Sequence, residues 1–109
     1  MPIHGKARAS LANIAKQHTL ITYGELAGEL LILPPHSIRQ VTDALERLME
    51  EDAAANRPFI AALVSNKALR GLPGPGFFDC ARRLGRYSTP GDTDDVTFHA
   101  AELRAVFAC

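Results

Sequence analysis

Apolar residues recur every three or four positions in five stretches of the chain, the spacing of one face of an α-helix. The first stretch covers residues 6–18, and a second, short one lies in GELAGELL (24–31). The third runs from about residue 38 to about residue 52, the fourth lies in FFDCARRLGRY (77–87), and the fifth follows DTDD (92–95). The fifth repeat predicts a buried stripe made of Val96, Ala100, Leu103 and Phe107.

Short polar motifs and prolines mark the ends of these helices. Thr22 and Glu25 have the spacing of a capping box, in which each side chain accepts a hydrogen bond from the other residue's backbone N–H. SIRQ (37–40) repeats this spacing before the third helix, with Gln40 as the return partner, and either aspartate that closes DTDD can cap the last helix. LPPH (33–36) ends the second helix, because proline has no N–H to donate and restricts the residue before it.

Two segments have the composition of β-strands. TLITY (19–23) is short and β-branched, and RPFIAALVSNK (57–67) has a continuous apolar run that predicts a strand buried on both faces. The rigid loop GLPGPG (71–76) follows and is expected to direct Phe77 into the core. Phe78 would then point elsewhere on the helix, as an exposed ring.

These elements predict a single domain over residues 1–109, mainly α with a small β component (α+β), with about five helices and two or three short strands. The chain is 47% apolar and 22% charged, which suits one globular core. The sequence opens without an apolar signal segment and has no run near the ~20 residues of a membrane span. We therefore expect a cytoplasmic protein that does not enter a membrane.

Residue types that perform chemistry are scattered rather than clustered. The cysteines, Cys80 and Cys109, are far apart, and Cys80 is expected to be a buried, inert thiol. The four histidines lie in separate segments without an HExxH pair, and GLPGPG has prolines where a phosphate loop needs N–H donors. The sequence thus predicts no enzyme, no metal site and no cofactor.

The formal net charge is zero, but the charges are segregated along the chain. Residues 43–52 are strongly acidic and residues 67–86 strongly basic. The two segments solvate two helices or meet each other, or else one of them contacts a partner. The candidate protein-binding residues in and between them are Glu46, Glu50, Glu51, Asp52, Phe78, Arg82, Arg83 and Arg86.

Two phrases carry a resemblance to known proteins. TYGELA (22–27), followed by Arg39, Val41 and the Ala44-Leu45 pair, resembles the winged-helix DNA-binding domain of the alkylguanine-alkyltransferase and alkyltransferase-like family over residues 20–65. That resemblance implies a winged helix-turn-helix, with Tyr23 near the phosphate backbone and Arg39 as the intruding arginine. PFIAALV (58–64) stands where the family has its Pro-Cys-His-Arg-Val acceptor motif, so alkyl transfer is excluded. The ALV-NK-G-PGPGFF phrase resembles a set of small bacterial proteins and implies no activity.

Two functional hypotheses remain from the sequence. The first is a non-catalytic protein-binding module, such as an inhibitor, antitoxin or immunity protein. Its acidic face (43–52) would cover a basic partner such as a nuclease, or the face with GFF (76–78) and the nearby arginines would be the contact. The second is a winged helix that binds DNA, although acidic residues on the outer side of its recognition helix would repel phosphates. The residues that would contact DNA are Tyr23, Arg39, Gln40, Lys67 and Arg70. The partner is another protein under the first hypothesis and DNA under the second.

Overall fold

The computed structural model describes residues 2–87 and 94–108. In this part of the chain, five α-helices and two very short strands confirm a mainly α protein with a small β component. The helices are α1 (Ile3–Lys16), α2 (Tyr23–Glu29), α3 (Ser37–Ala54), α4 (Pro75–Arg83) and α5 (Asp95–Ala108). The strands are β1 (Ile21–Thr22) and β2 (Val64–Ser65), and two 3-10 helices, η1 (Ile60–Leu63) and η2 (Lys67–Leu69), flank β2.

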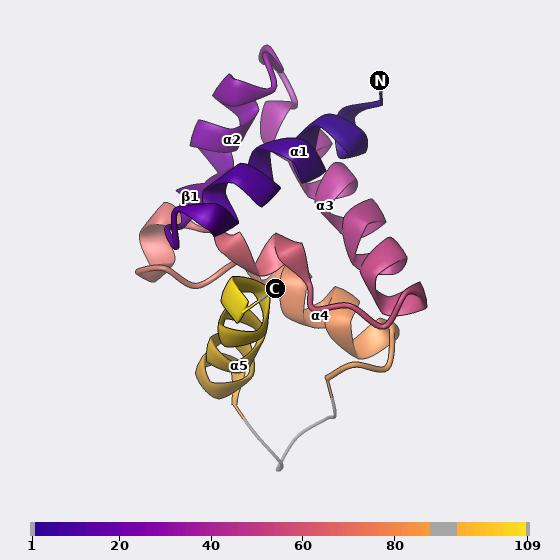
Figure 1. Ribbon diagram of the computed structural model, residues 1–109. Helices are drawn as coiled ribbons and strands as arrows, with labels where there is room; N and C mark the ends of the chain where they lie inside the picture. Colours follow the sequence, from indigo (N-terminus) through magenta and orange to yellow (C-terminus); the bar gives the residue numbers. More distant parts are fainter. Residues whose placement is uncertain (1, 88–93, 109) are drawn as a thin grey trace.

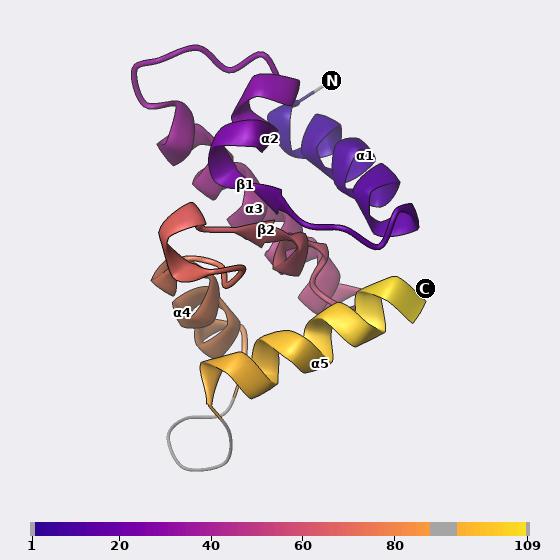
Figure 2. The ribbon, with the colours of Figure 1, turned by 90° about the vertical axis from the view of Figure 1, so that its left-hand side faces the viewer.

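The helices surround the central strands and η1 (Figures 1 and 2). In Figure 1, α1 and α2 lie at one end and α4 and α5 at the other, while α3 runs along one side and packs against α1, α2 and α4. Phe59 and the segment from Ala61 to Ser65 are buried at the centre. None of the described helices has the length and apolarity that a membrane span requires.

The predicted strand over residues 57–67 is wrong for most of its length. β1 pairs with β2 in parallel, with Ile21 opposite Val64 and Thr22 opposite Ser65. The apolar run before β2 forms η1 instead, and α1, α3 and α5 pack on it. Helices that bury the run offer no backbone partners, so its backbone groups bond within the turn and to side chains of α3 and α5. The winged helix-turn-helix itself stays a prediction, because this parallel pair neither tests nor requires a wing.

One predicted capping box is confirmed and the other is wrong. The Glu25 N–H donates to Thr22 Oγ1 at 3.1 Å, and the Thr22 N–H donates to Glu25 Oε1 at 2.9 Å. These bonds lower the pKa of Glu25. Ser37, by contrast, is the first residue of α3, and His36 precedes it in a left-handed conformation without a side-chain cap bond. Asp94 caps α5 as expected, since its carboxylate accepts the Thr97 N–H at 2.7 Å.

The GLPGPG loop delivers both phenylalanines into the core. Phe77 is buried as predicted, but Phe78 is only 4% exposed, so the expectation of an exposed ring is wrong. Phe78 packs edge-on against Phe77, with ring centroids 5.2 Å apart, and also meets Tyr87 and Phe98. The reason is that α4 is covered on two sides, so the face beside Phe77 is as buried as the face that carries it.

The buried face of α5 also differs from the predicted stripe. Phe98, His99 and Val106 are buried, whereas Val96 is 60% exposed. Of the predicted stripe, Leu103 and Phe107 are partly buried against the core and Ala100 is half-buried, so only Val96 is wrongly predicted. The most buried face of α5 lies beside this stripe and includes His99. Cys80 is buried as expected, and burial raises the pKa of its thiol. Cys109 lies outside the described residues.

Lowering the pH from about 7.5 to about 5.5 is expected to lower the free energy of unfolding through His99. Its Nε2–H donates to the Ala62 carbonyl at 2.8 Å, and burial lowers the pKa of His99 below its ordinary value of 6.5. The unfolded chain therefore takes up the proton at a higher pH than the folded chain does. The contribution of His99 to the free energy of unfolding is fully present above the ordinary pKa. It is lost as the pH falls from there towards the lower pKa of the folded state.

Urea unfolding at several pH values measures this effect. The variant His99→Gln keeps an amide that can donate to Ala62 but does not titrate, so its stability should vary less with pH over the same range. An equal slope in both proteins would contradict the assignment to His99.

Candidate functional site

The acidic and basic segments meet each other along α3 and α4. Arg83 lies 4.0 Å from Glu46 and 3.6 Å from Glu50, measured between guanidinium nitrogens and carboxylate oxygens. All three side chains remain partly exposed. The sequence left open whether the two segments meet or one of them contacts a partner, and this contact leaves less of either segment open to another protein.

The two acids at the end of α3 face inward, towards α1. Asp52 is only 1% exposed, so its assignment to a binding surface is wrong. Its carboxylate pairs with Arg8 at 3.0 Å and Arg57 at 3.1 Å, and it accepts the Ile60 N–H at 3.1 Å. Glu51 is more exposed and pairs with Arg8 at 3.1 Å. After α3 the chain turns back and brings Arg57 and Ile60 to the carboxylate of Asp52. In the sequence, Asp52 is only the last acid of an acidic run.

The arginines around the end of α4 join that helix to its neighbours. Arg82 pairs with Asp79 and Asp95 at 3.3 and 3.4 Å, and its guanidinium lies 4.5 Å from the centre of the Tyr87 ring. Arg86 pairs with Glu102 at 3.0 Å and lies 4.1 Å from the centre of the Phe59 ring. Both arginines therefore stabilise the packing of α4, α5 and η1, and neither forms the open basic face that the sequence suggested.

The residues assigned to DNA contact come from separate elements. Tyr23 is half-buried, and its hydroxyl accepts the Gly74 N–H at 3.0 Å, so it holds the glycine–proline loop. Burial raises its pKa. Arg39 and Gln40 are exposed in the first turns of α3, while Lys67 and Arg70 are exposed on and just after η2.

The sequence did not predict the exposed apolar segment that lies between α2 and α3. Leu31 is 84% exposed, Leu33 is 77% exposed, and Ile38 in the first turn of α3 is 49% exposed. We call Leu31, Leu33 and Ile38 the apolar loop residues. Figure 2 shows this loop arching outward from α2 before the chain enters α3. Large contiguous apolar patches on a protein surface often mark interaction sites, and these three side chains are exposed within eight residues of the chain.

The backbone at Leu31 makes this exposure more unusual. α2 ends in a Schellman motif, in which the Ile32 N–H donates to the Ala27 carbonyl at 3.0 Å and the Leu31 N–H donates to the Gly28 carbonyl at 3.1 Å. Leu31 occupies the left-handed position of that motif, with φ of 58°. Glycine is the usual residue there, because a side chain clashes with the following carbonyl. The signal in the sequence was the run of four apolar residues, 30–33, immediately before two prolines.

The described ranges, 2–87 and 94–108, contain no group of three or more His, Cys, Asp and Glu side chains that could hold a metal ion. No protein-family model, curated protein or solved structure matches the chain.

Proposed function

We propose that this chain is a non-catalytic protein-binding module that presents the apolar loop residues to a partner protein. One observation carries the proposal: Leu31 is 84% exposed and left-handed at the same position. Folding alone does not explain this leucine, because its side chain gains almost nothing from burial and its backbone is strained. A partner that buries the side chain explains why a leucine occupies the site.

The loop suits recognition because its backbone is already restrained in the free protein. The Schellman motif fixes the end beside α2, and Pro34 and Pro35 restrict the backbone before α3. A loop ordered before binding loses less entropy on association than a flexible one. The expected partner offers an apolar groove that accepts Leu31 and Leu33, which is compatible with an inhibitor, antitoxin or immunity protein. The contact then lies on the loop, and the charged segments serve the fold.

Replacing Leu31 with glycine is expected to stabilise the fold and weaken partner binding. Glycine removes the left-handed strain, which stabilises the fold, but it also makes the unfolded chain more flexible, which destabilises the fold by less. The free energy of unfolding should therefore rise by about 0.5–1 kcal/mol. Partner affinity should fall about tenfold, as for the loss of an apolar anchor. Chemical denaturation measures the first effect, and calorimetry with the purified partner measures the second.

The partner can be found with a photo-crosslinking residue at position 33, introduced in the host. Position 47, an exposed arginine position on α3, provides the matched control. One protein should crosslink from position 33 and not from position 47, and Leu31→Gly should reduce its yield. Equal yields from both positions, or full affinity in Leu31→Gly, would show that the loop is not the contact.

Binding of duplex DNA is a second candidate function, and one observation favours it. Arg39, Lys67 and Arg70 are exposed and have no ion pair within the described residues, whereas Arg82, Arg83 and Arg86 all have one. A short fluorescent duplex titrated across a salt series tests this function. Binding that weakens steeply with salt and is lost in Arg39→Ala would support it, and no binding at low salt would reject it.

A further inference from the structure

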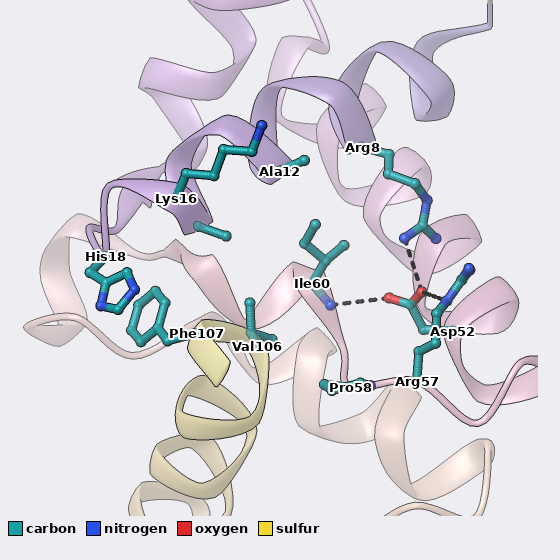
Figure 3. Close-up of a pocket in the computed structure, with 11 residues that line it drawn as sticks. Arg8, Ala12, Lys16, His18, Asp52, Arg57, Pro58, Ile60, Val106 and Phe107 are labelled. Carbon is teal, nitrogen blue, oxygen red and sulfur yellow. Dashed lines mark hydrogen bonds and ion pairs between the residues drawn. The ribbon is translucent and has the colours of Figure 1, made fainter. Parts of the chain in front are cut away.

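A pocket of about 330 Å³ opens between α1, the segment around η1, and α5. Its size lies within the range of small-molecule sites, roughly 300–1,000 Å³. Figure 3 shows its lining side chains, which come from three parts of the chain far apart in sequence.

The middle of the pocket is apolar. Ala12 and Ala15 are small, so α1 leaves space where larger side chains would have filled it. Ile60 projects into that space, and Phe107 closes one end. The Phe107 ring stacks on His18, with centroids 4.9 Å apart and planes 15° apart, so this end of the pocket has a flat aromatic wall.

The charges lie at the edges of the pocket and are mostly positive. Figure 3 shows Lys16 on one side of Ile60, and Arg8 and Arg57 on the other. The one carboxylate, Asp52, already holds both arginines and the Ile60 N–H. Arg57 uses only Nε for Asp52, and Lys16 has no ion pair within the described residues. The pocket therefore offers cationic donors beside an apolar interior, with its only acid neutralised.

We propose that this pocket binds a small organic anion that has one carboxylate and an aromatic or branched apolar body. The apolar body would lie over Ile60 and against Phe107, and the carboxylate would meet Lys16, because Arg57 is already paired with Asp52. A single negative charge fits better than several, because Asp52 stands at the same rim and repels further negative charge. This site shares no residue with the apolar loop, so its test is independent of the test of the protein-binding proposal.

A pair of probes with the same shape and different charge tests the proposal. We expect 2-naphthoate to shift the amide resonances of α1 and α5 with a Kd of about 0.1–1 mM, as for a ligand of this size. The uncharged 2-naphthamide should bind roughly fivefold more weakly, because it cannot pair with a cation. No shift at about 5 mM naphthoate, or equal affinity for the two probes, would overturn the proposal.

Two variants of α1 locate the site, each with a matched control on the same helix. Ala12 is exposed at the pocket, so Ala12→Phe should fill the space and abolish naphthoate binding, whereas Ala9→Phe on the exposed face outside the pocket should not. Lys16→Gln should weaken binding about threefold, and Lys6→Gln should leave it unchanged. Naphthoate binding that survives Ala12→Phe would place the anion elsewhere and refute this pocket.

Discussion

Replacing Phe77 with alanine is expected to lower the free energy of unfolding by about 3–5 kcal/mol, a large part of the 5–15 kcal/mol typical of a domain. The ring is only 5% exposed and contacts four other rings, which are those of Phe59, Phe78, Phe98 and His99. These rings come from α4, from α5 and from the residue just before η1, so no single element can move to fill the cavity. The loss is therefore expected near the upper end of the range.

Chemical denaturation of the wild type and of Phe77→Ala measures this loss directly. Val96→Ala is the control, because Val96 is an apolar residue of α5 on the solvent side, and it should change the free energy of unfolding by less than about 0.5 kcal/mol. Comparable losses in both variants would mean that the aromatic cluster is not the centre of the core.

Replacing Asp52 with asparagine is expected to destabilise the fold by about 3 kcal/mol. Asparagine keeps the shape and can still accept the Ile60 N–H, so the change isolates the negative charge. Without that charge, Arg8 and Arg57 face each other across a buried amide. Both arginines reach solvent in part, and their rehydration places the loss at the lower end of the range for broken buried pairs.

The neighbouring Glu51→Gln is the matched control, because it makes the same chemical change on a carboxylate that also pairs with Arg8. Glu51 is partly exposed, and exposed pairs contribute at most about 1 kcal/mol. Denaturant midpoints of the two variants should therefore differ clearly. Equal effects would contradict the view that Asp52 is a structural centre and Glu51 an accessory.

The features that the sequence predicted correctly depend on nearby residues. The Thr22–Glu25 cap spans only four residues, and the loop that turns Phe77 inward is restricted by its own glycines and prolines. The limits of the five helices followed from periodicity to within a few residues. These features are set mainly by residues close together in the sequence, and the bond from the Gly74 N–H to Tyr23 adds a distant contact to them.

The features that the sequence missed depend on tertiary contacts. The apolar run before β2 became a 3-10 helix because three helices cover it, and periodicity cannot distinguish a buried strand from a buried turn. Asp52 looked like a surface acid until the chain turned back and brought Arg57 to it. The exposure of Leu31 and Leu33 was hidden because apolar residues are assigned to a core by default.

The left-handed leucine that closes α2 also has an evolutionary consequence. Random substitution and selection for folding would together replace it with glycine, because glycine is the better residue for that backbone. Phe77 and Asp52 face no such drift, since folding itself retains them. Position 31 should therefore vary with lineage in a way that core positions do not. If the proposed function holds, relatives that bind the partner should keep a large apolar residue at position 31, and relatives that do not bind it should carry glycine.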